Sequence, residues 1–135
     1  MNAQGLPLLI GRVLLALMFV TAGYSKLTGL EGTAGYIASV GLPAPMLLAV
    51  AAGVVEVVAG VLIIVGWQAR WAALALAAFT VVASVFFHNY WAKPADKAFM
   101  EQLMFMKNMS VTGGLLVLFA FGAGALSLDA RRKAA

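Results

Sequence analysis

Hydrophobic residues gather in four long runs along the chain, and shorter polar stretches separate them. The runs cover about residues 6–24, 46–66, 71–87 and 103–126. A helix that crosses a membrane needs about 20 mostly apolar residues, and each run is close to this length. A membrane-spanning strand would instead alternate polar and apolar residues over about ten positions. The pattern therefore predicts four transmembrane helices.

The polar stretches predict how these helices are connected. Glu31–Val40 is typical of a short helix at the membrane interface, which Gly41-Leu42-Pro43 stops because proline lacks an N–H and fixes φ. Only residues 67–70 join the second and third runs, so these helices form an antiparallel hairpin. Residues 88–102 form a longer, wetter link. We expect one all-α domain over residues 1–135, an integral membrane four-helix bundle with a short interfacial helix between helices 1 and 2.

The composition agrees with a lipid environment and excludes several other classes of protein. Of the 135 residues, 64% are hydrophobic and 10% are charged. An ordinary soluble domain is about 45–50% apolar and about 25% charged. The same figures exclude a disordered chain, and the lack of cysteine excludes thiol catalysis, a disulfide scaffold and Cys-ligated metals.

The positive charge is distributed in a way that suits a membrane and not a nucleic acid. The net charge is +4, but the basic residues form no continuous face, and their one cluster is the C-terminal Arg131, Arg132 and Lys133. Such a tail suits an anionic leaflet. Four spans put both chain ends on one side, where the basic residues outnumber those of the other side by four to three: Arg70, Arg131, Arg132 and Lys133 against Lys26, Lys93 and Lys97. The positive-inside rule then predicts that both termini are cytoplasmic.

A few charged residues interrupt the apolar runs, and each needs a physical reason. A charge at the centre of a span costs about 2.5–3.5 kcal/mol on insertion scales, so such residues are expected to face the interior of the bundle. Helical spacing supports this placement, because each charge shares a face with small residues that admit a neighbouring helix. The three predicted faces are Arg12, Ala16, Phe19, Gly23 and Lys26; Gly53, Glu56 and Gly60; and Lys107, Ser110, Gly114 and Val117.

The depth of each charge follows from the helical rise of about 1.5 Å per residue. Glu56 falls near the membrane centre, Arg12 about 6 Å toward the termini and Lys107 about 10 Å toward the other side. Long basic side chains cover such gaps, so Glu56 can neutralise Arg12 or Lys107 but cannot fully compensate both. We expect a structural ion pair between Arg12 and Glu56, which by itself would only fix helix packing.

Hydrogen-bond donors then remain in excess in the half of the bundle away from the termini. With Glu56, they make up the predicted ligand-binding residues: Lys26, Glu56, His88, Asn89, Lys107 and Asn108. A buried surplus of donors and positive charge favours a ligand with carbonyl or anionic oxygens. Two of these residues also have a purely structural interpretation, Lys26 reaching the headgroups and His88 lying at the interface. One histidine and no cysteine argue against a metal site.

Several short motifs follow one another along nearly the whole chain. They are Arg12, Gly23-Tyr24-Ser25-Lys26, Gly41-Leu42-Pro43-Ala44-Pro45, Glu56 with Gly60, His88-Asn89-Tyr90-Trp91, Lys107-Asn108 with Gly113-Gly114, and Ser127-Leu128-Asp129. In this order they resemble the DoxX family of small four-helix bacterial inner-membrane proteins. The resemblance implies an inner-membrane location, with relatives that are subunits of a thiosulfate:quinone oxidoreductase or are tied to other membrane redox complexes. One fold carries many functions, so the resemblance alone assigns no activity.

Three functions fit these observations, and none of them assigns a catalytic residue. The first is a redox-associated module that binds a quinone or another small oxygen-bearing ligand between its helices, has no covalently bound cofactor and works with a redox partner protein. In it Lys107 and Asn108 bind the ligand oxygen, His88 relays protons and Glu56 holds a basic neighbour. The second is a proton-coupled transporter, which needs an unpaired Glu56. The third is a non-catalytic assembly or partner subunit; small-residue faces also allow a homo-oligomer.

Overall fold

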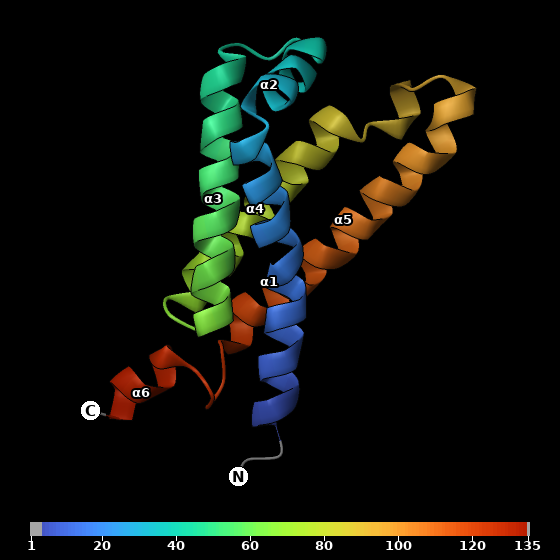
Figure 1. The fold of residues 1–135 in the computed structure, drawn as a ribbon. Helices are drawn as coiled ribbons and strands as arrows, with labels where there is room; N and C mark the ends of the chain where they lie inside the picture. Colours follow the sequence, from blue (N-terminus) through green and yellow to red (C-terminus); the bar gives the residue numbers. More distant parts are fainter. Residues whose placement is uncertain (1–3, 135) are drawn as a thin grey trace.

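The computed structural model describes residues 4–134, and its regular elements are all helices (Figure 1). In chain order they are α1 (Gly5–Thr28), α2 (Leu30–Ser39), α3 (Pro45–Val65), α4 (Ala69–Phe87), the 3-10 turn η1 (Tyr90–Ala92), α5 (Ala95–Phe121) and α6 (Leu128–Ala134). Four helical segments are long and apolar enough to cross a membrane, and they contain α1, α3, α4 and α5. The predicted all-α four-helix class is confirmed, and α2 is the predicted short helix between helices 1 and 2.

Local sequence explains where most of these helices begin and end. Pro45 occupies the first turn of α3, where its missing N–H costs nothing, and Gly66 ends the helix with φ 72°. The largest difference from prediction concerns α5, which begins at Ala95 and not near 103, and ends at Phe121 and not near 126. Its first turns are polar and so fall outside an apolar window, and Gly122, with φ 82°, stops it early.

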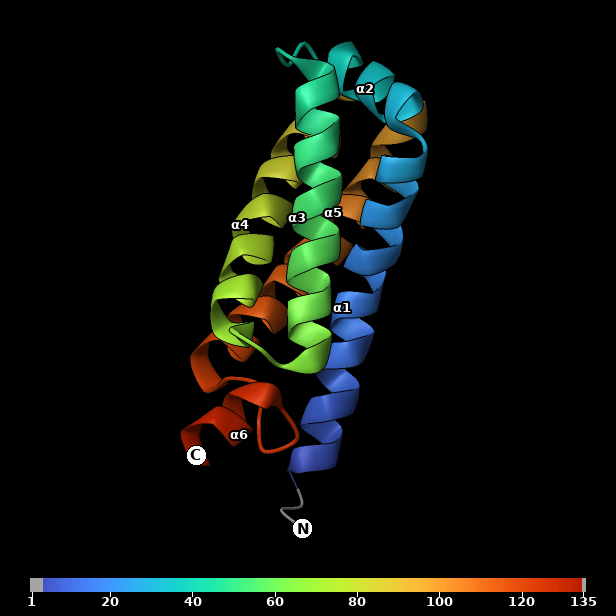
Figure 2. The same cartoon turned by 60° about the vertical axis from the view of Figure 1, so that its left-hand side comes forward.

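Glycines allow α1 and α3 to run antiparallel in close contact (Figures 1 and 2). A Cβ added to Gly23 would lie 2.7 Å from the backbone oxygen of Gly53, and one added to Gly60 would lie 2.7 Å from Val20 Cγ2. Real Cβ atoms do not approach backbone oxygens this closely, so only glycine fits at Gly23. The predicted inward faces of α1 and α3 are confirmed except at Lys26: their other positions are buried, whereas the side chain of Lys26 is 30% exposed.

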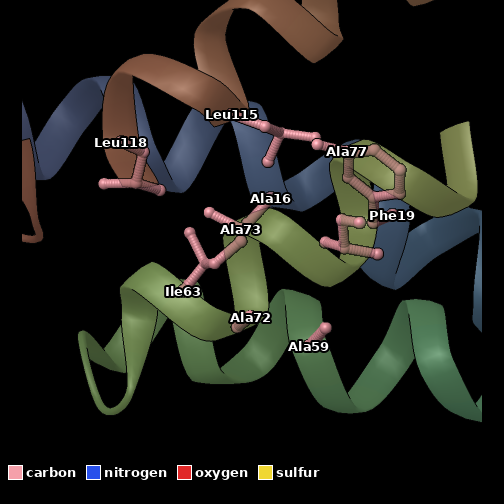
Figure 3. Packing of buried hydrophobic residues seen from close by; sticks show 10 residues of the cluster. Ala16, Phe19, Ala59, Ile63, Ala72, Ala73, Ala77, Leu115 and Leu118 are labelled. Atoms are coloured by element: carbon pink, nitrogen blue, oxygen red, sulfur yellow. The ribbon is translucent and has the colours of Figure 1, made fainter. Parts of the chain in front are cut away.

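The larger hydrophobic core lies in the half of the bundle nearer the termini, and a smaller one, formed by Ala34, Ile37 and Ala49, joins α2 to α3 at the other end. Small and branched side chains meet in the larger core, including Ala16 of α1, Ile63 of α3, Ala73 and Ala77 of α4, and Leu115 of α5 (Figure 3). Alanines let the four helices approach one another closely.

Toward the opposite end α5 slants away from α1 and α3 (Figure 1), and α2 lies across that end (Figure 2). The bundle is therefore tight at one end and splayed at the other.

The C-terminal segment folds back against the tight end, and Arg12 holds it there. The guanidinium of Arg12, a residue only 4% exposed, donates hydrogen bonds to the backbone oxygens of Ile64, Ala123 and Leu126. The structure does not form the ion pair predicted between Arg12 and Glu56; Arg12 is satisfied by carbonyls instead. These carbonyls are available because Ile64 lies in the last turn of α3, while Ala123 and Leu126 lie in the segment after α5, where no helix supplies donors.

Candidate functional site

A cavity of about 550 Å³ occupies the splayed half of the bundle. Five helices line it, from α1 to α5, and most of the lining side chains are aliphatic or aromatic. Leu48 and Val55 of α3 and Val82 and Phe86 of α4 line the cavity and are each more than a third exposed. Part of the cavity wall therefore lies on the outer surface of α3 and α4, which lipid chains contact in a membrane; Tyr36 of α2 and Lys107 of α5 are further exposed lining residues.

Five of the six predicted ligand-binding residues line this one cavity: Lys26, Glu56, His88, Lys107 and Asn108. They come from four different helices or helix ends and are brought together by the fold. The sixth, Asn89, does not line the cavity, but its Oδ1 is buried and has no hydrogen-bond partner among the described residues.

Lys26 and Glu56 form an ion pair across the α1–α3 contact. Nζ of Lys26 lies 2.8 Å from Oε2 of Glu56, and the Glu56 side chain is 6% exposed, against 30% for Lys26. Glu56 also lines the cavity, so the ion pair borders the space where a ligand would lie. Glu56 is thus neutralised by Lys26 and not by Arg12. Lys26 follows Gly23 by three residues on the inward face of α1.

His88 joins the end of α4 to the first turns of α5. Its Nδ1 lies 2.7 Å from Oε2 of Glu101, and both side chains are about a quarter exposed: 25% for His88 and 23% for Glu101. His88 also lines the cavity. This places one imidazole in contact with the cavity and with a carboxylate that water can reach.

Asn108 and Lys107 are neighbours on α5 with different surroundings. Asn108 is buried and donates through Nδ2 to Ser84 Oγ at 2.9 Å, and Ser84 donates in turn to the Thr80 carbonyl oxygen at 2.7 Å. Lys107 is exposed, lines the cavity and forms no hydrogen bond or ion pair with any described residue. The ammonium of Lys107 is therefore free to meet a ligand.

The inward face predicted for α5 was wrong. The buried residues of this helix are Asn108, Thr112, Leu115 and Leu118, whereas the prediction was Lys107, Ser110, Gly114 and Val117. The helix is rotated so that the amide of Asn108, and not the ammonium of Lys107, enters the packed interior. This orientation is the cheaper one, because burying an amide that keeps a hydrogen bond costs less than burying an unpaired charge.

Some polar residues of the cavity were missed in the sequence. Thr80, Thr33 and Tyr36 line it, Ser84 holds Asn108 and Glu101 holds His88. One signal was present, because Thr80, Ser84 and His88 recur every four residues and so share one helical face. The contribution of α2 had no such signal, since it depends on how that helix lies across the bundle.

Tyr36 connects the interfacial helix α2 to the rim of the cavity. Its ring lies 5.0 Å from that of Phe87, measured between centroids. Partial burial of the phenol raises the pKa of Tyr36 above its ordinary value, and the nearby Glu101 carboxylate raises it further. Tyr36 therefore presents a neutral hydroxyl to the cavity at physiological pH.

The chemistry available at this site is binding through hydrogen bonds and charge. Among residues 4–134, no group of three or more His, Cys, Asp or Glu side chains is placed to hold a metal ion. The polar groups are an ammonium without a partner among the described residues, an ion pair, an imidazole, the amide of Asn108 and hydroxyls, on otherwise apolar walls. Such a combination suits a largely apolar molecule with a few oxygen atoms.

Four apolar helices around a partly polar cavity define a small multi-pass membrane protein. The family model described as DoxX matches residues 7–89, and the chain belongs to the DoxX family. It is 40% identical to inner membrane protein YphA of Escherichia coli, with 96% of this chain and 92% of the relative aligned, and 38% identical to inner membrane protein YqjF of the same organism, with 93% and 92% aligned. The protein is accordingly an integral inner-membrane protein.

A more distant similarity reaches eukaryotic proteins. The chain is 28% identical to a Surfeit locus protein 4 homolog of Drosophila melanogaster, over 93% of this chain and 40% of that protein. No solved structure matches the chain.

Proposed function

We propose that this DoxX-family protein is a redox-associated membrane module that binds a quinone, or a similar lipid-soluble molecule with carbonyl oxygens, in the cavity. The observation that carries the proposal is the meeting of Lys26, Glu56, His88, Lys107 and Asn108 around one apolar space. Aromatic and aliphatic walls would hold the ring of such a ligand, and the donors would hold its oxygens.

The residues at the cavity would take different roles in binding. Lys107 has no partner among the described residues, so its ammonium would donate to a ligand oxygen. Asn108, whose amide is fixed by its hydrogen bond to Ser84, would orient the ligand. His88, in contact with Glu101, would carry protons between water and the cavity. A bound quinone supplies electron and proton transfer, and a redox partner protein would supply or remove the electrons.

The opening of the cavity supports a ligand dissolved in the bilayer. The exposed side chains of Val55 and Val82 mark an opening between the middle parts of α3 and α4, where lipid chains lie. The rim formed by Tyr36 and His88 lies at the end of the cavity nearer water, so the opening beside Val55 and Val82 is the one that meets the bilayer. A molecule with an apolar body can enter sideways from the membrane.

The test is a calorimetric titration of the purified protein in detergent micelles with a naphthoquinone and with naphthalene, the matching hydrocarbon. A hydrogen bond to a charged group contributes about 1.5–3 kcal/mol, so Lys107→Met should weaken naphthoquinone binding roughly tenfold or more. The matched control is Lys97→Met, on the same helix but away from the cavity. Equal affinity for the two ligands, or equal losses in the two variants, would contradict the proposal. Absence of any binding would favour the assembly subunit instead.

We also propose that both termini are cytoplasmic. Lys26 is engaged by Glu56, so the basic residues at the terminal end, which are Arg70, Arg131, Arg132 and Lys133, are opposed by Lys93 and Lys97 at the other end. Because the chain has no cysteine, single cysteines can report each side. Ser39→Cys should react with a membrane-impermeant maleimide in spheroplasts, and Lys133→Cys should react only after lysis. The reverse pattern would overturn this orientation.

A further inference from the structure

A second recess lies at the terminal end of the bundle, far from the first cavity. It has a volume of about 490 Å³ and is bounded by the start of α4, the segment after α5, and α6 (Figure 1). Three basic side chains line it, those of Arg70, Arg132 and Lys133, together with one carboxylate, that of Asp129. None of the three basic side chains forms an ion pair with another described residue.

The one carboxylate in the recess is already engaged by the protein. Asp129 accepts a hydrogen bond from the N–H of Gln68 at 2.8 Å and one from the N–H of Ala69 at 3.0 Å. It therefore caps the N-terminus of α4, where the helix dipole favours negative charge. With one carboxylate against three cations, the recess keeps a surplus of positive charge that faces outward.

The guanidinium of Arg70 lies beside Gly122 in this recess. A Cβ added to Gly122 would lie 3.1 Å from Arg70 Nε, and Gly122 has φ +82°, which side-chain-bearing residues rarely adopt. The guanidinium thus lies against the chain at the point where α5 ends. Arg70 itself is exposed, so its guanidinium can reach a ligand in the recess.

Aromatic residues continue the recess toward the membrane. Trp71 and Phe121 line it and are 64% and 78% exposed. Tryptophan prefers the headgroup level of a bilayer, with its ring against the upper part of the acyl chains. The recess therefore presents cations at headgroup depth and an apolar surface next to them.

We propose that this recess binds the phosphate-bearing headgroup of an anionic phospholipid. Arg70, Arg132 and Lys133 would surround the phosphate, and the acyl chains would lie along Trp71 and Phe121. Arginine matches phosphate geometry because its planar guanidinium donates two parallel hydrogen bonds. The side chain of Arg131 does not line the recess, so this basic residue would add only general attraction to the surface.

Fluorescence quenching can test the proposal on the full chain. Trp67→Phe and Trp91→Phe leave Trp71 as the reporter, and the protein is reconstituted into vesicles of phosphatidylcholine with increasing brominated phosphatidylglycerol. Selective binding would quench Trp71 more than brominated phosphatidylcholine does at equal content. Arg132→Gln or Lys133→Gln should lower the preference about fivefold each, as expected for one basic residue near an anionic lipid. Arg131→Gln is the matched control on the same exposed helix and should change it little.

Three outcomes would overturn the proposal. Equal quenching of Trp71 by the two lipids would remove selective binding. Equal effects of Arg131→Gln and Arg132→Gln would reduce the site to general attraction by the tail. Relief of quenching by inorganic phosphate, beyond that by chloride at the same ionic strength, would assign the recess to a soluble phosphate and not to a lipid. Arg70→Gln tests the same preference at the α4 side of the recess.

Discussion

The ammonium of Lys26 lies 2.8 Å from the carboxylate of Glu56, so the charge near the middle of α3 is neutralised from the end of α1. The two partners differ in their access to water, because the Glu56 side chain is 6% exposed and that of Lys26 is 30% exposed. Lys26 can turn toward the headgroups if its partner is lost, whereas Glu56 has no such escape. The pair is therefore unequal in what each member needs from the other.

This inequality predicts unequal effects of removing each partner. Lys26→Met leaves a buried carboxylate without its counter-ion and should lower the free energy of unfolding by about 2–4 kcal/mol, near the range for broken buried pairs. Glu56→Gln leaves a mobile lysine and should cost less than half as much. The double variant should be more stable than Lys26→Met alone. Unfolding in mixed micelles with rising denaturing detergent measures all three, and Lys97→Met is the exposed control. A neutral Lys26→Met would contradict the pair.

Helical spacing predicted the inward faces of α1 and α3, but not which charges meet. Spacing within one helix decides which side chains share a face, and this is local information. The partner of Glu56 depends on the register between two helices, which is set where Gly23 meets Gly53. This register puts Glu56 beside the last turns of α1 and leaves Arg12 beside Ile64. The depth of a residue, counted from the middle of its own span, gives no information about the register between two helices.

The cavity shows the same division between local and long-range information. Five of its polar residues were predicted because lipid rejects them and each must have a reason to lie in or beside a span. The rotation of α5, which buries Asn108 and exposes Lys107, follows from its packing against α4, where Ser84 receives the amide. The sequence of α5 does not predict that rotation, because apolar residues occupy most faces of this helix and form no single stripe.

The close contact of α1 with α3 predicts that Gly23 does not tolerate even one added carbon. Gly23→Ala would place a Cβ 2.7 Å from the Gly53 carbonyl oxygen and 2.9 Å from Glu56 Cβ, so the helices must separate. We expect a loss of about 1–3 kcal/mol in the free energy of unfolding, as for overpacked cores. Gly11→Ala is the matched control on the same helix, since nothing lies within 4 Å of its added Cβ. It should be neutral or slightly stabilising, because alanine favours helices. Similar losses in both variants would contradict this packing.

The hydrogen bonds of Arg12 predict that lysine cannot replace it. The guanidinium reaches the carbonyls of Ile64, Ala123 and Leu126 at once, and a single ammonium cannot match that planar arrangement. Arg12→Lys should loosen the C-terminal segment, so trypsin should cut after Arg131 and Arg132 several times faster than in the unchanged protein. Lys93→Arg, at the other end of the bundle, controls for altered trypsin sites. Unchanged cleavage rates would show that other contacts hold the segment.

The raised pKa of Tyr36 predicts a loss of stability at alkaline pH. The unfolded chain releases the phenolic proton near the ordinary tyrosine pKa of about 10, before the folded chain does, so above this pH the unfolded state binds fewer protons. Stability is therefore full below pH about 10 and falls as pH rises through the folded-state pKa. Tyr36→Phe should remove this part of the alkaline loss. Thermal unfolding across the alkaline range measures it, with Tyr24→Phe, the loss of an exposed phenol, as control.

The Glu101 contribution to this pKa can be separated from burial. Glu101→Gln removes the negative charge but keeps the shape of the side chain, so the midpoint of Tyr36 ionisation should move down toward that of an ordinary tyrosine without reaching it. The absorbance titration of Tyr36→Phe is subtracted from that of the unchanged protein, and that of the double variant Tyr36→Phe with Glu101→Gln from that of Glu101→Gln alone. Each difference isolates the ionisation of Tyr36 from that of the other tyrosines. Glu31→Gln removes an acid from the same helix as Tyr36 and should leave the midpoint in place. If Glu101→Gln also leaves it in place, α2 does not lie close enough to the start of α5 to close the end of the cavity.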